Sequence, residues 1–233
     1  MLNVRRSQDR GYFKNEWLES FHSFSFGSYH DSSHMNFGPL RVINQDVIQP
    51  GSGFDFHGHR DMEIFTYILQ GELEHQDSMG HREKIRQGEV QIMSAGRGIL
   101  HSEFNASKTE RVELLQIWVQ PETFGLTPRY EQKKFEEQEK LDQLKLIISP
   151  DAEGNSLKIF QKTWVWASLL QKSSKLEFTL NQGKKAWLHI GSGQMKINGE
   201  FYGKGDAVSM AEGRLHLEGV APVSDFVILE MGE

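Results

Sequence analysis

Two short groups of residues in this chain have the side-chain types and spacing of metal ligands. His57 and His59 are separated by one residue, and so are His101 and Glu103. Residues i and i+2 of a β-strand point to the same face of the sheet. If the two segments lie on neighbouring strands that face the interior of a barrel, these four side chains converge on one point. The spacing therefore predicts a mononuclear metal site.

The ligand types leave the identity of the metal open. Imidazole accepts Fe, Mn, Co, Ni, Cu and Zn in the divalent state, and four protein ligands leave one or two positions free on a five- or six-coordinate ion. A lone His-x-His is a weak signal, because it also occurs on polar strands that bind no metal. The second group strengthens the prediction. The chain has no cysteine, which excludes thiolate zinc sites, iron–sulfur clusters and a cysteine nucleophile.

The elements that must position these residues are short strands. Stretches rich in β-branched and aromatic residues are bounded by glycine or polar turns, and 22 Gly against 6 Pro suits a fold with many tight turns. One stretch, Glu131–Leu144, has the composition of a solvated linker helix. We therefore expect an all-β protein with strands at Glu63–Leu69, Val90–Met93, Val112–Val119 and Phe226–Leu229.

Charge and hydropathy exclude several classes of protein. The net charge of −6 argues against a nucleic-acid binder, which usually has a basic face. Residues 1–13 are polar and lack the apolar stretch of a secretory signal. The longest apolar run, near Ile64–Leu69, is too short to cross a bilayer. We expect a soluble, cytoplasmic protein.

The two halves of the sequence are similar. The order strand, glycine, strand recurs at Gly71 and Gly193. Further along, "GEVQIMSAGRG", which begins at Gly88, resembles "GDAVSMAEGRL", which begins at Gly205, and the offset of 117 residues stays constant through Gly96 and Gly213. An internal duplication of one β-barrel unit is the simplest explanation. We expect an N-terminal metal-binding domain over residues 1–135 and a C-terminal domain without metal over residues 136–233.

Counting along the second copy tests the metal site. From Gly193 and Gly213, the positions of the four ligands fall on Thr179, Asn181, Glu218 and Val220. Three of the four ligand types are lost, so the second copy is predicted to be structural. His75 and His81, beside a predicted hairpin turn, and His22, among phenylalanines, are expected to have packing or surface roles.

Longer motifs resemble a known family. The run Gly51–Gly71, which holds His57 and His59, resembles the first cupin motif, and Gly88–Asn105 resembles the second, with Ser94 in place of the usual proline. More specifically, "HGHRDMEIFTYILQGELEHQDSMG" and "GEVQIMSAGRGILHSEFN" are similar to the pirin family. "WLESFHSFSFGSYHD", "GPLRVINQDVI" and "TPRYEQKKF" resemble the bacterial pirin-like quercetinases. The resemblance covers most of residues 1–150.

The resemblance implies a fold and a ligand set. It implies a bicupin, with two tandem double-stranded β-helix (jelly-roll) barrels, and its metal ligands fall on the same four residues. Most cupins place their carboxylate ligand at the position of Glu63, whereas the pirin pattern selects Glu103 and leaves Glu63 as a supporting polar group. Gly58 stands where pirins usually have proline, which leaves the ligand identities unchanged.

The resemblance also implies quercetin 2,3-dioxygenase activity, and we expect the protein to be a monomer. A flavonol binds the metal, for which iron is the first choice, O₂ is inserted and carbon monoxide leaves. Glu103 would take the proton of the flavonol hydroxyl. Candidates to line a slot for the flat substrate are Phe37, Phe54, Phe56 and Met93.

Two other functions use the same site. One is a pirin-like regulatory or redox-sensing protein that acts through protein partners. The other is hydrolysis or isomerisation at a Lewis-acid metal, because one fold hosts many chemistries.

Overall fold

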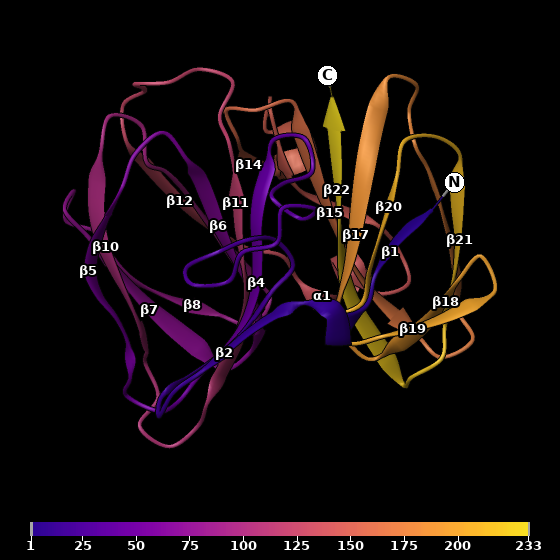
Figure 1. Ribbon diagram of the computed structural model, residues 1–233, viewed down its shortest axis with the longest axis horizontal. Coiled ribbons are helices and arrows are strands. Elements are labelled where there is room, and N and C mark those ends of the chain that lie inside the picture. The colour runs from indigo at the N-terminus through magenta and orange to yellow at the C-terminus, as the bar shows by residue number, and fades with distance from the viewer. Residues whose placement is uncertain (1, 233) are drawn as a thin grey trace. The chain divides into compact units, whose positions relative to one another are not determined.

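The computed structural model describes residues 2–232 and consists almost entirely of β-strands (Figure 1). The chain forms two compact units. The N-terminal unit comprises residues 11–134 and 159–161, and the C-terminal unit comprises residues 2–10, 135–158 and 162–232. Among the described residues, no helix is long and apolar enough to cross a membrane. The predicted all-β class with two jelly-roll halves is confirmed.

The N-terminal unit is built from two antiparallel sheets. The larger sheet, in spatial order, contains β12 (Arg129–Lys134), β9 (Glu89–Ser94), β6 (Glu63–Gln70), β11 (Val112–Val119), β4 (Leu40–Ile48), β3 (Leu18–His22) and β2 (Gly11–Lys14). The smaller sheet contains β5 (Gly53–His59), β10 (Ile99–Asn105), β7 (Glu72–Asp77) and β8 (Arg82–Arg86).

The C-terminal unit repeats this arrangement. Its larger sheet contains β1 (Asn3–Arg5), β20 (Ala207–Met210), β17 (Lys184–Ser192), β22 (Val223–Gly232), β15 (Thr163–Gln171), β13 (Lys145–Ser149) and β14 (Leu157–Lys158). Its smaller sheet contains β16 (Lys175–Thr179), β21 (Arg214–Gly219), β18 (Gln194–Ile197) and β19 (Glu200–Gly203). The N-terminal strand β1 pairs with β20, so the first residues of the chain belong to this unit.

Matched glycines mark the same place in both units. Gly71 (φ 83°) joins β6 to β7, and Gly193 (φ 82°) joins β17 to β18. A Cβ on Gly71 would lie 2.8 Å from the carbonyl oxygen of Arg111, and one on Gly193 would lie 2.5 Å from that of Val223. Only glycine adopts this backbone without strain and permits so close an approach. The duplication inferred from sequence therefore has a structural basis.

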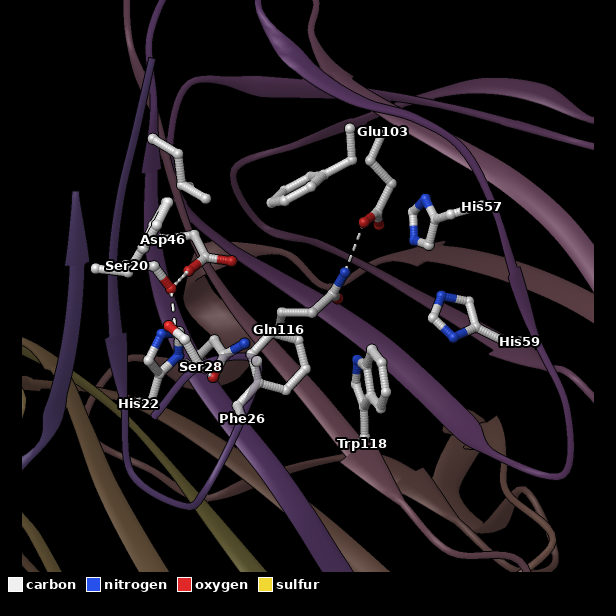
Figure 2. A pocket seen from close by; sticks show the side chains of 15 residues that line it. Ser20, His22, Phe26, Ser28, Asp46, His57, His59, Glu103, Gln116 and Trp118 are labelled. Atoms are coloured by element: carbon white, nitrogen blue, oxygen red, sulfur yellow. Dashed lines mark hydrogen bonds between the residues drawn. The ribbon is translucent and has the colours of Figure 1, made fainter. Parts of the chain in front are cut away.

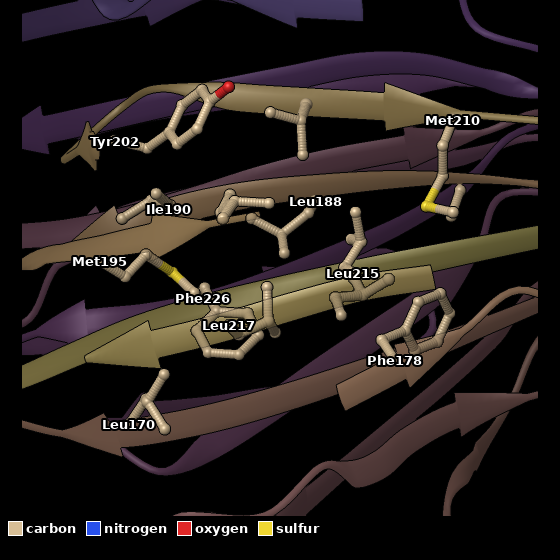
Figure 3. Packing of buried hydrophobic residues seen from close by; sticks show 14 of the residues in the cluster. Leu170, Phe178, Leu188, Ile190, Met195, Tyr202, Met210, Leu215, Leu217 and Phe226 are labelled. Atoms are coloured by element: carbon tan, nitrogen blue, oxygen red, sulfur yellow. The ribbon is translucent and has the colours of Figure 1, made fainter. Parts of the chain in front are cut away.

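The C-terminal unit encloses an apolar interior to which both of its sheets contribute (Figure 3). Leu188 and Phe226 come from the larger sheet, whereas Met195, Leu215 and Leu217 come from the smaller one. The N-terminal unit has a comparable cluster, which includes Ile48, Ile68, Leu73 and Ile85, over only part of its interior. The rest of that interior holds the polar side chains described below.

The predicted linker helix over Glu131–Leu144 is wrong. The structure has strand β12 up to Lys134, a single helical turn, α1 (Glu137–Lys140), and two short 3-10 turns elsewhere, Ser7–Asp9 and Glu153–Asn155. The Glu, Gln and Lys composition favours a helix locally. The free edge of β9 offers every residue of β12 a pairing partner, and this tertiary contact overrides the local preference.

We expect Gly71→Ala to destabilise the protein more than Gly80→Ala. Both glycines have positive φ, 83° and 97°, but a Cβ on Gly80 meets nothing within 4 Å. Each substitution costs about 1–2 kcal/mol for the left-handed backbone. Gly71→Ala costs about 1–3 kcal/mol more, because β11 must shift. Urea unfolding of both variants measures this difference, and equal losses would contradict the close approach.

Candidate metal centre

The two predicted ligand groups lie on neighbouring strands. β5 and β10 pair antiparallel, and His57 stands directly opposite His101. The register then shifts, because Glu103 pairs with Phe54, so that β5 contains one residue more than β10 between the two pairs. Such a bulge turns the side chains that follow it to the other face. It places Phe54 on the same side of the sheet as His57.

Three histidines form a compact cluster. The ligand atoms of His57, His59 and His101 all lie within 4.8 Å of one another. The ring centroids of His57 and His101 are 4.5 Å apart, and that of His59 lies 4.8 Å from each. Glu103 belongs to a second, overlapping group with His75 and His101, again within 4.8 Å. Among the described residues, no group whose ligand atoms all lie within 4.8 Å of one another contains all four predicted ligands.

The hydrogen bond of His57 defines which of its nitrogens carries the proton. Its Nδ1 lies 2.8 Å from the backbone oxygen of Asp55, which can only accept. Nδ1 therefore carries the hydrogen, and Nε2 of the neutral ring has a free lone pair. That Nε2 lies 3.1 Å from Nε2 of His101.

His101 is held by a chain of buried polar groups behind it. Its Nδ1 lies 3.5 Å from Nδ1 of His75, and Nε2 of His75 lies 3.3 Å from the carboxylate of Asp77. Nδ1 of His81 also contacts Asp77, at 2.9 Å. The carboxylate accepts from both rings, so Nε2 of His75 carries its hydrogen and Nδ1 of His75 accepts from His101.

With hydrogens on Nδ1 of both His57 and His101, the Nε2 atoms of the two rings turn lone pairs towards each other. If His101 instead donated from Nε2 to His57, then either its bare Nδ1 would face a bare Nδ1 of His75 at 3.5 Å or His75 would turn a bare nitrogen towards Asp77. The hydrogen bonds from His81 and His75 hold the pKa of Asp77 below its ordinary value, even though burial acts in the opposite direction. Asp77 is therefore a carboxylate, and a bare nitrogen beside it is unfavourable. A cation between His57 and His101 resolves the remaining repulsion.

Burial keeps two histidines of the cluster, His59 and His101, neutral. Desolvation, with the neighbouring rings, lowers the pKa of His59 to about 4 and that of His101 to about 3. A metal binds only the neutral imidazole. The site is therefore prepared for a metal at neutral pH without first losing a proton from these two rings.

Glu103 is fixed by an amide. Its Oε2 accepts a hydrogen bond of 2.7 Å from Nε2 of Gln116, whose Oε1 accepts one of 2.7 Å from the Thr66 hydroxyl. Oε1 of Glu103 is fully buried and has no hydrogen-bond donor among the described residues. A buried carboxylate oxygen without a donor is costly unless a cation or a bound hydroxyl satisfies it. The donor set thus fits a divalent ion.

Glu63 lies outside both clusters. Its carboxyl accepts hydrogen bonds from the Ser94 hydroxyl at 2.9 Å and from the backbone of Phe160 at 3.2 Å. Burial raises its pKa. These contacts match the supporting role predicted for Glu63.

A cavity of about 320 Å³ opens beside the histidines. In Figure 2, His57, His59 and Glu103 lie on one side, and Ser20, His22 and Asp46 lie on the other. Gln116 and Trp118 lie between the two sides, and the Trp118 ring meets His59 and Phe26 edge to face. The aromatic rings of the lining are those of Phe13, Phe26, Phe54 and Trp118.

Of the four residues predicted to line this cavity, the structure places only Phe54 there. Phe56 lies on the opposite face of β5 and is 54% exposed. Met93 packs into an apolar cluster with Ile64, and Phe37 pairs with Leu40 in a turn. Alternation along β5 predicts the same face for Phe54 and Phe56, and the bulge, which no sequence pattern reveals, separates them.

The C-terminal unit has apolar side chains at the matching positions. His57 pairs with His101 in one unit, as Phe178 pairs with Leu215 in the other. These counterparts are buried in the apolar interior of Figure 3. The other counterparts follow the same registers: Leu180 for His59, Leu217 for Glu103 and Ile197 for His75.

The sequence count from Gly193 and Gly213 assigned the wrong residues to these positions. It gave Thr179, Asn181, Glu218 and Val220. The link from Gly213 into β21 is shorter than the corresponding link from Gly96 into β10, so the count overshoots. Glu218 instead lies at the surface, where it pairs with Lys175 and Lys196.

Several residues of the site escape the sequence patterns. Gln116 and Thr66 are polar residues inside otherwise apolar strands, which is the signal that marks a buried polar role. His75 is fully buried against His101, although its place beside a hairpin turn predicts a surface or packing role. Asp46 lies within the buried strand β4 and carries the same signal as Gln116.

We expect His75→Phe to weaken metal binding about 10- to 100-fold, because His101 loses the acceptor that orients it. His30→Ala, in an exposed loop, serves as the control. Competition with a chromophoric chelator measures the dissociation constant. Equal affinities for His75→Phe and the control would contradict the positioning role of His75.

The lowered histidine pKa values set a pH dependence for the metal-free protein. The unfolded chain binds protons at histidines near pH 6.5, whereas folded His59 and His101 do so only near pH 4 and 3. Their contribution to stability is therefore lost as the pH falls below about 6.5. Asp46, whose pKa burial raises to about 7, acts in the opposite sense.

The comparison of two proteins isolates the histidine effect. We expect the melting temperature of metal-free His101→Phe to rise relative to that of the metal-free wild type between pH 7.5 and pH 5. Thermal denaturation in chelator measures both. A constant difference between the two proteins would contradict the buried, neutral state of His101.

Comparisons with known proteins agree with this architecture. The family described as Pirin matches residues 3–119, and the family described as the quercetinase C-terminal cupin domain matches residues 146–231. A quercetin 2,3-dioxygenase of Escherichia coli (strain K12) is 46% identical over 199 residues, which are 85% of this chain and 85% of that protein.

Solved structures give the same result. The bacterial pirin YhhW of Escherichia coli, in complex with nickel(II), superposes with a TM-score of 0.93 and 40% identity over 100% of this chain and 99% of that one. A quercetin 2,3-dioxygenase of Acinetobacter baumannii shares the fold, with a TM-score of 0.79 at 21% identity, over 99% of this chain and 85% of that one.

Proposed function

This chain belongs to the pirin family, and we propose that it is a metal-dependent dioxygenase that cleaves a flavonol such as quercetin with O₂. The relative from Escherichia coli that carries the name quercetin 2,3-dioxygenase supports the predicted oxidoreductase. In this reaction both atoms of O₂ enter the ring-opened product, and one carbon of the flavonol leaves as carbon monoxide.

We propose His57, His59, His101 and Glu103 as the ligands of one divalent transition metal. The observation that carries this assignment is the 3.1 Å approach of Nε2 of His57 to Nε2 of His101, with the ligand atom of His59 within 4.8 Å of both. Imidazole and carboxylate suit iron, our first choice, as well as the nickel held by YhhW. The bound ion would act as a Lewis acid and lower the pKa of a chelating hydroxyl.

Glu103 is placed to move a proton. Oε2 is held by Gln116, while the buried Oε1 has no donor among the described residues. Oε1 would ligate the metal and would accept the proton of the flavonol hydroxyl on tilting away from the ion, while the hydrogen bond from Gln116 keeps Oε2 in place. General acid–base catalysis of this kind contributes about 10²- to 10⁴-fold to a rate.

The cavity suits a flat aromatic molecule. Its volume of about 320 Å³ lies at the lower end of the range of small-molecule sites. The rings of Phe26, Phe54 and Trp118 line it, and they can stack on or meet the edges of a flavonol. Glu103, which lines the same cavity, is only 3% exposed.

Turnover of quercetin tests the proposal. We expect the metal-loaded protein to bleach quercetin with equal amounts of O₂ consumed and carbon monoxide released. Glu103→Gln keeps the size and the contact with Gln116 but loses the basic oxygen, so turnover should fall about 100-fold or more. His30→Ala, in an exposed loop, is the control variant and should keep the turnover of the wild-type protein.

The same assay decides between the functions that share this site. Absence of turnover with Fe(II), Mn(II), Co(II), Ni(II), Cu(II) and Zn(II) would overturn the dioxygenase and favour the regulatory alternative. Bleaching without carbon monoxide release would indicate another oxidation.

A further inference from the structure

The wall of the cavity opposite the histidines is polar, and the metal site does not use it. Ser20 and Asp46 face each other across strands β3 and β4, and His22 faces Asn44 two pairs further along. All four side chains are buried and line the cavity. Figure 2 shows Ser20, His22 and Asp46 grouped on this wall, across the cavity from His57 and Glu103.

Asp46 is a buried carboxyl group with little to satisfy it. Asp46 is only 4% exposed. The hydroxyl of Ser20 donates to Oδ1, and this is the one hydrogen bond to the carboxyl from the described residues. No lysine or arginine of the described chain forms an ion pair with it. A buried carboxyl without an ion pair is costly, so a structural role alone does not explain its place in β4.

The second carboxyl oxygen of Asp46 is available to a ligand. In Figure 2 one oxygen turns towards Ser20 and the other towards the interior of the cavity. In the neighbouring pair, Nδ1 of His22 donates to Oδ1 of Asn44 at 2.8 Å. This wall therefore offers a hydrogen-bond acceptor to whatever fills the cavity.

We infer that Asp46, oriented by Ser20, is a second anchor of the cavity that accepts a hydrogen bond from a phenolic hydroxyl at the end of the substrate remote from the metal. The inference rests on the proposed function and narrows its substrate class. The cavity would select flat aromatic molecules that carry chelating oxygens at one end and a hydroxyl at the other. Apolar rings between the two ends, from Phe26, Phe54 and Trp118, fit the middle of such a molecule.

Binding of two flavonols to the metal-loaded protein tests the anchor. Quercetin and 3-hydroxyflavone share the hydroxyl–carbonyl pair that chelates a metal, but 3-hydroxyflavone has no other hydroxyl. Dissociation constants are measured by absorbance without O₂, so that neither ligand is consumed. We expect the wild-type protein to bind quercetin at least about tenfold more tightly, because 3-hydroxyflavone leaves the buried carboxyl of Asp46 without a second hydrogen bond.

Variants assign this preference to Asp46. We expect Asp46→Leu to reduce it to about twofold or less, and Asp46→Asn, which keeps the shape and one acceptor, to give an intermediate value. Glu19→Gln is the matched control, because Glu19 neighbours Ser20 on β3 but bonds Tyr12 outside the cavity. It should keep the wild-type preference. Circular dichroism and metal content verify that each variant folds. If Asp46→Leu does not fold, the flavonol preference of Asp46→Asn alone tests the role of Asp46.

Each outcome decides the inference. A wild-type protein that binds both flavonols equally or binds neither, or an Asp46→Asn variant with the full wild-type preference, would overturn the second anchor. A preference that depends on Asp46, in a protein that consumes no O₂ with quercetin, would uphold the anchor and overturn the dioxygenase. The two proposals therefore fail separately.

Discussion

The N-terminal unit depends on one local conflict, two imidazole nitrogens 3.1 Å apart that both present lone pairs. The carbonyl of Asp55 fixes the proton of His57 on the far side of its ring, and the buried chain from His75 to Asp77 does the same for His101. Burial lowers the pKa of His101 to about 3, so protonation does not relieve the conflict at neutral pH. A bound cation would relieve it, so the polar groups behind the rings would favour the proposed metal-bound state.

The duplicated fold shows what this arrangement replaces. In the C-terminal unit the same registers bring Phe178 and Leu215 together in a continuous apolar core. In the N-terminal unit, histidines and one carboxylate occupy these positions, and its apolar cluster fills only part of the interior. The first unit thus gives up core packing for a polar site, a common exchange of stability for function. The second unit keeps the packing.

The sequence predicted much of this structure because its signals are local. Alternation and glycine turns located the strands, and the i, i+2 spacing identified His57, His59, His101 and Glu103 as candidates. Features that arise from pairing between strands were not accessible. The bulge in β5 separated Phe54 from Phe56, and the edge of β9 turned a helix-like segment into a strand. The contacts of His75 and Asp46 depend on the register of several strands.

The most direct test is an anomalous difference map from crystals of the metal-loaded protein. The account predicts a single peak in each chain, about 2.0–2.3 Å from Nε2 of both His57 and His101. A ring nitrogen of His59 and Oε1 of Glu103 should lie within the same distance. A peak elsewhere, or a map without a peak at this position, would contradict the account.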